Sequence, residues 1–194
     1  MAGNILLRIR RGEEQKGHCE GDGRLILKSN ITLIGMPGSG KSTVGVILAK
    51  YLSLGFIDTD VLIQINRQKS LQEIINESDY LNLRKVEEEE ILKINIRDHV
   101  IATGGSAVYS LKAMAHLQDI STIVFLEVEF GEICKRIHNF ETRGIAKAKS
   151  QTFRDLFNER QFLYRKYAEL TIDGNKLSQE EIAGIIASKF RANN

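Results

Sequence analysis

Apolar residues gather in five short runs along the chain, and longer stretches of mixed apolar and polar residues separate these runs. Short apolar runs rich in β-branched residues are typical of strands, whereas apolar residues at every third or fourth position are typical of helices. Strands that alternate with helices predict a parallel sheet covered by helices. The pattern therefore predicts an α/β fold with strands at residues 31–34, 56–57, 100–102, 123–126 and 170–172.

Helix positions are indicated by capping residues and by periodicity. Ser70 with Glu73, and Ser178 with Glu181, have the spacing at which a hydroxyl and a carboxylate satisfy free amides of a first helical turn. Residues 79–97 carry apolar side chains at helical spacing, with charged residues grouped on the other face. We predict that helices begin at both capping boxes and that a single long helix spans residues 79–97.

The segment before the first strand differs from the rest in composition. Residues 1–28 are rich in glycine and charged residues, and we interpret them as an N-terminal extension that is either a hairpin or a flexible segment. The rest has no proline-rich linker, because the only proline, Pro37, lies inside a glycine-rich loop. A hydrophobic content of 42% in 194 residues can fill one core. We therefore predict a single domain over residues 29–194.

Charge and cysteine content exclude several classes of protein. The 27 Lys and Arg residues nearly balance the 25 Asp and Glu residues, which argues against a nucleic-acid partner. No apolar run approaches the roughly 20 residues of a membrane span, and Arg8 interrupts the first apolar run. Cys19 and Cys134 belong to no Cys-x-x-Cys pair, which argues against a zinc site or a disulfide framework. We expect a cytoplasmic protein that binds no membrane.

The most specific motif is GMPGSGKST at residues 35–43, between a predicted strand and a predicted helix. Its glycines let backbone N–H groups and the helix N-terminus converge on a phosphate, its lysine adds positive charge, and the next hydroxyl, Ser42, ligates Mg²⁺. The loop alone does not define a reaction, because GTPases, motor ATPases and small-molecule kinases share it. The residues expected to bind ATP here are Gly38, Ser39, Gly40, Lys41, Ser42 and Thr43.

Two carboxylates follow the second predicted strand, in the sequence FIDTD. In a parallel sheet the end of this strand lies beside the phosphate loop. Because side chains alternate along a strand, Asp58 and Asp60 are expected to point the same way. We predict that Asp58 is a metal ligand and that Asp60 meets or deprotonates an acceptor hydroxyl. The competing interpretation is a strand-end acid that caps the next helix.

Five motifs stand in an order and at a spacing similar to those of the shikimate kinase family: GMPGSGKST, Asp58-Thr59-Asp60, Arg84-x-x-Glu87, Ala102-Thr103-Gly104-Gly105 and Glu159-Arg160-x-x-Leu163-Tyr164. The chain resembles this family. The resemblance implies a nucleoside-monophosphate-kinase-like fold, a three-layer α/β/α P-loop kinase with a five-stranded parallel sheet. It also implies an acceptor-binding helical segment at about residues 61–97 and a mobile lid at about residues 138–150.

The resemblance further implies an acceptor that is a carboxylated cyclohexene triol, held by an arginine cluster. Arg84 and Arg160 occupy the matching positions, and Glu87 is expected to orient Arg84 by an ion pair. Gly104 and Gly105 are expected to let the acceptor approach the backbone and take hydrogen bonds from its N–H groups.

In the lid, Arg143 matches the arginine that the family brings to the transferred phosphate, and Arg136 matches the arginine expected against adenine. A closed lid excludes water during phosphoryl transfer. The catalytic residues implied by the resemblance are Lys41, Asp60 and Arg143.

Three departures from the family pattern concern the acceptor wall and the lid. Ser106 stands in place of a third glycine, and Gln161-Phe162 follows Arg160 where the family has a proline at the second position. The lid reads Arg143-Gly144-Ile145-Ala146 in place of Arg-Pro-Leu-Leu, so that Gly144 frees a backbone that proline would restrain.

The leading hypothesis is a monomeric, Mg²⁺-dependent kinase that transfers the ATP γ-phosphate to the 3-hydroxyl of shikimate, in aromatic amino-acid biosynthesis. Its partners are then ATP or ADP and this small carboxylated polyol. Two alternatives stay open. One is a related kinase for another small hydroxy acid or sugar, such as gluconate, and the other is a non-catalytic ATP-binding module.

Overall fold

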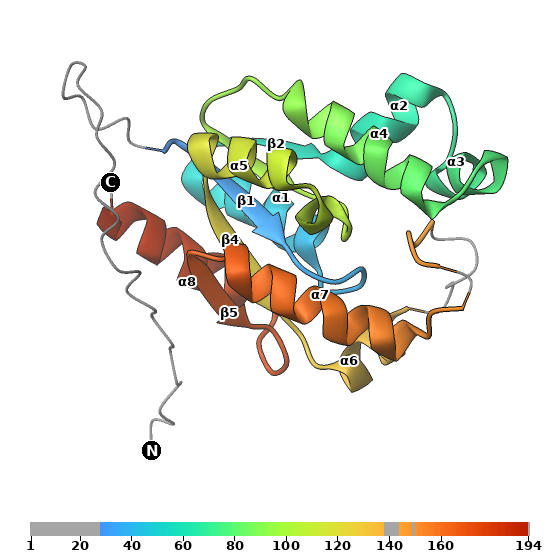
Figure 1. Ribbon diagram of the computed structural model, residues 1–194. Coiled ribbons are helices and arrows are strands. Elements are labelled where there is room, and N and C mark those ends of the chain that lie inside the picture. Colours follow the sequence, from blue (N-terminus) through green and yellow to red (C-terminus); the bar gives the residue numbers. More distant parts are fainter. Residues whose placement is uncertain (1–27, 138–143, 149, 194) are drawn as a thin grey trace, which may run out of the picture.

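A computed structural model of the chain describes residues 28–137, 144–148 and 150–193 (Figure 1). Five strands form one sheet, in the order β2-β3-β1-β4-β5, and every neighbouring pair is parallel. Each predicted apolar run lies in one of these strands, which confirms the parallel α/β prediction. The strands are β1 (Asn30–Ile34), β2 (Gly55–Asp58), β3 (His99–Ala102), β4 (Ser121–Glu127) and β5 (Leu170–Asp173).

Helices cover both faces of the sheet, which gives the expected three layers (Figure 1). On one face, α4, α5 and α7 pack on the strands through residues such as Ile91, Met114 and Tyr164. On the other face, α1 and α8 pack through Leu48 and Ile186. The helices are α1 (Lys41–Leu52), α2 (Thr59–Arg67), α3 (Leu71–Glu77), α4 (Tyr80–Leu92), the 3-10 helix η1 (Ala107–Tyr109), α5 (Leu111–Ile120), α6 (Phe130–Arg136), α7 (Phe153–Tyr167) and α8 (Gln179–Asn193).

The strand order brings three connecting segments together. β3 pairs with both β1 and β2, and because all three strands are parallel their carboxyl ends lie at the same edge of the sheet. β1 continues into the glycine loop, β2 continues directly into α2, and β3 continues into residues 103–106. This edge is therefore where the predicted nucleotide and acceptor residues can meet.

Both predicted capping boxes are present. The Ser70 hydroxyl accepts from the Glu73 amide at 3.2 Å, and the Ser178 hydroxyl accepts from the Glu181 amide at 3.2 Å. A third box, Thr152 with Asp155, begins α7. We did not predict it, because its acid is Asp, whereas the common pattern has Glu or Gln.

The predicted long helix over residues 79–97 is wrong at its C-terminal end, because α4 stops at Leu92. Beyond it, Ile94 is buried in the core. The Ile96 carbonyl accepts a hydrogen bond of 2.8 Å from the side chain of Asn30, and Asp98 has a left-handed φ of 58°. These contacts hold the segment as an irregular connection to β3. The apolar spacing of the sequence fits such a packed connection as well as a helix.

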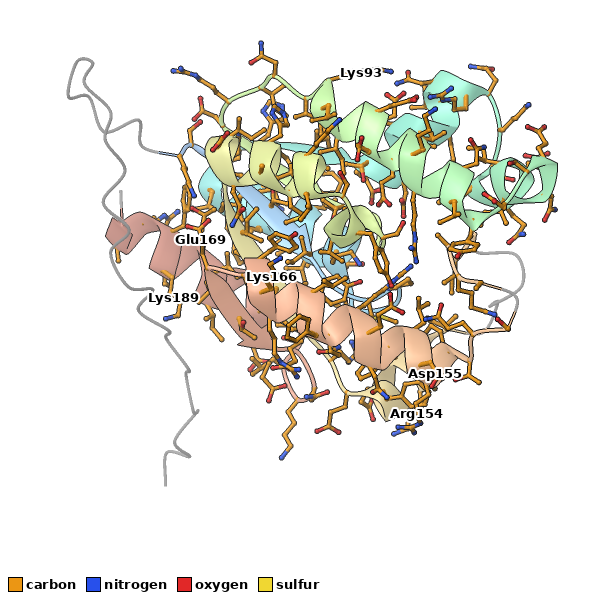
Figure 2. All side chains as sticks on the ribbon, in the orientation of Figure 1. Lys93, Arg154, Asp155, Lys166, Glu169 and Lys189 are labelled. Carbon is orange, nitrogen blue, oxygen red and sulfur yellow. The ribbon has the colours of Figure 1, made fainter. Side chains whose placement is uncertain are left out.

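One side chain interrupts the amphipathic pattern of α7. Leu156 and Tyr164, four residues to either side of Arg160, lie on the buried face of the helix. Arg160 lies on that same face and is only 1% exposed. The exposed side chains Arg154 and Lys166 lie near the two ends of α7 (Figure 2). A guanidinium on the buried face of a helix requires a specific partner, which makes Arg160 a candidate for function.

The helices that follow β2 form a small unit of their own beside the sheet. α2, α3 and α4 lie together (Figure 1), and Ile63, Ile74, Leu83 and Val86 form a separate apolar cluster that also includes Ala146. This unit corresponds to the predicted acceptor-binding segment at about residues 61–97. None of the helices in the described ranges is long and apolar enough to cross a membrane.

Candidate active site

A cavity of about 360 Å³ opens where the glycine loop, α2, α4, residues 103–106, residues 144–146 and α7 meet. Most of the predicted site residues line it: Gly38, Gly40, Lys41, Ser42, Thr43, Asp60, Gly104, Gly105, Arg136 and Arg160. Ser39, Asp58 and Arg84 do not line it directly. The predicted lid arginine, Arg143, lies outside the described residues.

The glycine loop prepares one end of this cavity for an anion. Gly38 and Gly40 have φ of +83° and +96°, which side-chain-bearing residues rarely adopt. Because Gly40 precedes α1 and has no side chain to cap it, the first-turn amides stay available to a phosphate. Lys41 is buried, and its Nζ donates to the carbonyls of Gly35 and Met36, both at 2.9 Å. The loop is thus closed around its own lysine.

Asp58 connects the glycine loop to α2. Its Oδ2 accepts a hydrogen bond of 2.6 Å from Ser42 Oγ, and its Oδ1 accepts one of 3.0 Å from the Asp60 amide. Asp58 is therefore the N-cap of α2, as the competing interpretation had it, and it also contacts the predicted metal-binding serine.

The prediction that Asp58 and Asp60 share one side of a strand is wrong. β2 ends at Asp58, and Asp60 belongs to the first turn of α2. Helical geometry, and not strand alternation, directs Asp60 into the cavity that Lys41 also lines. The two carboxylates consequently face different neighbours, which agrees with separate roles.

Two carboxylates converge at the turn after β3. A Cβ at position 104 would collide with Glu87 Oε1 and also with Asp60 Oδ1, so glycine is required there. The Gly104 amide donates a 3.0 Å hydrogen bond to Thr59 Oγ1. Gly104 therefore serves the site by leaving space; its own N–H group is bonded to Thr59, and a hydrogen bond from this glycine pair to an acceptor stays a prediction.

Glu87 does not form the predicted ion pair with Arg84. Its side chain is 3% exposed and accepts a short hydrogen bond from Ser106 Oγ, while its Oε1 has no hydrogen-bond partner among the described residues. Burial, together with the negative charge of Asp60, raises the pKa of Glu87 to about 7. In the sequence, the only indication of this contact is Ser106 in place of the family's third glycine, because a hydroxyl can donate a hydrogen bond to Glu87 and glycine has no side chain to do so.

Arg84 and Arg160 contact one aromatic ring. The Cζ atom of Arg84 lies 3.5 Å from the ring centroid of Tyr109, and that of Arg160 lies 5.5 Å from it. Neither guanidinium forms an ion pair with a carboxylate of the described residues. Burial lowers the pKa of Arg84, yet a guanidinium stays charged at physiological pH. Two positive charges beside the cavity are thus left for an anionic ligand.

Tyr164 fixes the turn that follows β3. Its hydroxyl donates a 2.7 Å hydrogen bond to the Gly105 carbonyl, and its ring stacks on Phe125 with the centroids 5.1 Å apart. Burial raises the pKa of this hydroxyl, so that it remains a donor. The sequence motif contained Tyr164, but sequence reasoning gave it no role.

Comparison with known proteins decides the family. A family model described as shikimate kinase matches residues 37–191. A shikimate kinase of Mycobacterium marinum is 34% identical over 162 residues, which cover 81% of this chain and 87% of that protein. The chain belongs to the shikimate kinase family. A shikimate kinase of a Sulfurihydrogenibium species is 32% identical over 163 residues, which cover 84% of this chain and 98% of that protein.

Solved shikimate kinases share the fold. The enzyme from Acinetobacter baumannii in complex with shikimate superimposes with a TM-score of 0.79 at 27% identity, covering 86% of this chain and 94% of that one. The enzyme from Aquifex aeolicus gives 0.70 at 28% identity, with 84% and 97% covered. These comparisons confirm the P-loop kinase fold and the class of ATP-dependent kinases.

The described C-terminal part of the predicted lid is attached to α3. The Gly144 amide donates to Gln72 Oε1 at 3.2 Å, φ of Gly144 is +66°, and a Cβ there would collide with Leu71. From the sequence, we expected Gly144 to free the backbone. In the structure, the missing side chain of Gly144 instead permits a close contact with α3. Next to it, Ile145 and Ala146 line the cavity, and the Ala146 carbonyl accepts from Arg160 at 2.8 Å.

Arg136, the residue that the shikimate kinase pattern places against adenine, ends α6 at the rim of the cavity. Its guanidinium donates a 3.2 Å hydrogen bond to the Gly174 carbonyl in the loop after β5. This contact holds the side chain at the rim of the cavity, and a guanidinium in such a place can stack on a base.

Proposed function

We propose that this protein transfers the γ-phosphate of ATP to the 3-hydroxyl of shikimate. The observation that carries the proposal is the pair of guanidiniums, Arg84 and Arg160, which have no carboxylate partner among the described residues and adjoin a cavity that also contains the phosphate loop and Asp60. Such a site suits an acceptor that carries both a carboxylate and a hydroxyl. Membership of the shikimate kinase family supports the same acceptor.

The nucleotide side of the proposal rests on the loop at residues 38–43. Its backbone amides and the N-terminus of α1 bind the phosphates, and Lys41 exchanges its two carbonyl partners for phosphate oxygens. Arg136 stacks against adenine. Arg143 adds positive charge at the transferred phosphate when the lid closes, as arginines do in related phosphoryl transfers.

The residues next to the loop fit a Mg²⁺ ion. Ser42 Oγ and Asp58 Oδ2 are hard oxygen donors 2.6 Å apart at the cavity edge, and Mg²⁺ in such sites takes one or two protein ligands plus phosphate oxygens and water. When bound, the ion neutralises charge on the β- and γ-phosphates. In this proposal Ser42 ligates it directly, and Asp58 holds Ser42 and the water shell.

On the acceptor side, Asp60 accepts the proton or the hydrogen bond of the attacking hydroxyl. Arg160 and Arg84 bind the acceptor carboxylate, and Gly104 and Gly105 leave room for its ring. Asp60, which is half-buried, has to act near the buried carboxyl group of Glu87. The raised pKa of Glu87 favours its neutral form, and this lowers the repulsion between the two carboxyl groups.

A coupled assay of ADP release tests the proposal. With MgATP, the protein should turn over shikimate well above background and prefer it to gluconate and other hydroxy acids. The methyl ester of shikimate, which lacks the carboxylate charge, should have a much higher KM. Binding of ATP without turnover of any acceptor would instead support a non-catalytic module, and a clear preference for gluconate would support the other alternative.

The remaining expectations are part of the same proposal. We propose a cytoplasmic monomer with one domain over residues 29–194. Sedimentation at micromolar concentration tests the oligomeric state, since a monomer of 21.9 kDa separates well from a dimer.

A further inference from the structure

The ring of Tyr109 contacts both arginines that we propose bind the acceptor, Arg84 and Arg160. It ends η1, which packs against both α4 and α7, the helices that carry Arg84 and Arg160. The Tyr109 amide donates to the Ser106 carbonyl at 3.0 Å, so the ring is attached directly to the turn that walls the cavity. One ring therefore links both arginines to the acceptor wall.

Arg84 depends on this ring for its position. It does not line the cavity, and Glu87, three residues further along α4, binds Ser106 and forms no ion pair with it. The groups that Arg84 does contact are aromatic faces: Tyr109 at 3.5 Å and Tyr80 at 5.0 Å from its Cζ. The electron-rich face of a ring attracts a guanidinium and lets it stack in parallel.

The same ring reduces the repulsion between the two cations. Arg160 is almost completely buried, and its positive charge lowers the pKa of Arg84 further. A ring face that contacts both guanidiniums stabilises each of them without supplying a negative charge that would compete with a ligand. A carboxylate in the place of Tyr109 would neutralise the pair and weaken its binding of an anion.

We propose that Tyr109 is a positioning residue that holds Arg84 beside Arg160, so that both guanidiniums bind the one carboxylate of the acceptor. The inference rests on the proposed function for the identity of that acceptor. The placement of Arg84 by the ring does not depend on it.

Kinetics with matched variants test the consequence. Tyr109→Leu should raise the KM for shikimate roughly tenfold, as expected for loss of a desolvated cation–π contact, and leave kcat and the KM for ATP near wild type. Tyr109→Phe is the control, because it keeps the ring face on which Arg84 stacks and removes only the hydroxyl, so its KM for shikimate should stay much closer to wild type than that of Tyr109→Leu. Tyr109→Met, which keeps a long apolar side chain without a ring, should resemble Tyr109→Leu if the latter folds poorly.

A mutant cycle separates positioning from a merely structural role. In an Arg84→Ala background, Tyr109→Leu should raise the KM for shikimate at most about twofold. The same tenfold rise in both backgrounds, or no rise in either, contradicts the proposal.

A spectroscopic test works without any acceptor. In ¹H–¹⁵N spectra, the guanidinium NεH signal of Arg84, assigned by its loss in Arg84→Lys, should be shifted upfield by the Tyr109 ring. The shift should persist in Tyr109→Phe and disappear in Tyr109→Leu. An unchanged signal in Tyr109→Leu overturns the placement, whereas failure of the wild type to phosphorylate shikimate overturns only the proposed function.

Discussion

At Glu87, the partner that the sequence spacing predicts differs from the partner that the folded chain provides. Its spacing from Arg84 fits an ion pair along a helix, but Ser106, from a turn after β3, takes its carboxylate. The result is a buried acid beside Asp60, with a pKa of about 7. No spacing rule within α4 could indicate this, because the partner comes from another element.

The protonation of Glu87 makes stability depend on pH. Because folding raises its pKa from 4.5 to about 7, this group's contribution to stability is full below pH 4.5 and is lost as the pH rises to about 7. Glu87→Gln cannot ionise and should avoid the loss. The variant should therefore gain up to about 3 kcal/mol relative to wild type between pH 4.5 and pH 8.

Urea unfolding of wild type and Glu87→Gln at both pH values measures this gain directly. A difference in stability that is the same at both pH values would refute the raised pKa. Aggregation or a change in m-value would show up in the same curves.

Substitutions of Asp60 and of Lys41 are expected to affect ATP binding and turnover differently. Asp60→Asn should keep the affinity for MgATP and lower turnover by roughly 10²- to 10⁴-fold, because only the acceptor loses its partner. Lys41→Met should weaken both nucleotide binding and turnover. Calorimetric titration with MgATP and the ADP-release assay distinguish the two, and an equal loss of ATP binding in both variants would contradict the role given to Asp60.

At the scale of elements, the sheet could be predicted because parallel strands are buried on both faces. Their runs, such as ITLI in β1, are apolar at nearly every position and stand out from the helices. The capping boxes at Ser70 and Ser178 were equally local signals. By contrast, the irregular segment after α4 is held by Asn30, whose side chain bonds to Ile96, 66 residues away in the sequence.

The candidate site was predicted in its parts but not in its connections. The phosphate loop is a contiguous motif, Asp60 was indicated by its place at the end of the second predicted strand, and Arg160 came from the family resemblance. Asp60 was placed on a strand because FIDTD continues an extended pattern, whereas the Asp58 cap starts α2 at the very next residue. Tyr109 carried no signal, since it belongs to no motif and contacts α4 and α7 only in the folded chain.

The contact between Gly144 and α3 gives a prediction about stability. Gly144→Ala would force a left-handed residue and a collision with Leu71, so it should destabilise the fold by more than about 1 kcal/mol. Gly184→Ala in α8 is the matched control. Nothing lies within 4 Å of its new Cβ, and it should stabilise by about 0.5 to 1 kcal/mol. Similar changes from both substitutions, measured by urea unfolding, would argue against a tight contact at Gly144.

At the scale of the whole molecule, the sheet lies between two helical layers, and α4 connects the sheet to the separate apolar cluster that it forms with α2 and α3. The cavity lies where these parts meet, so it takes residues from both. A ligand in the cavity should therefore stabilise the fold as a whole.

Thermal unfolding tests this linkage. Shikimate at a hundred times its Kd should increase the free energy of unfolding by about 2.7 kcal/mol, and an equal concentration of gluconate should leave it nearly unchanged. Absence of a shift with shikimate, in a protein that binds MgATP, would mean that the acceptor site takes a different ligand.

The buried Arg160 is expected to lower thermal stability while it supports catalysis. Arg160 is buried and has no carboxylate partner among the residues that the structure describes, and at such a position a neutral, well-packed side chain is favoured over a charged one. Arg160→Met is thus expected to yield a protein that is more thermally stable but inactive. In a laboratory selection for thermal stability alone, Arg160 should be among the first residues to be replaced. The frequency at which Arg160 is retained would then measure how strongly the selection also acts on activity.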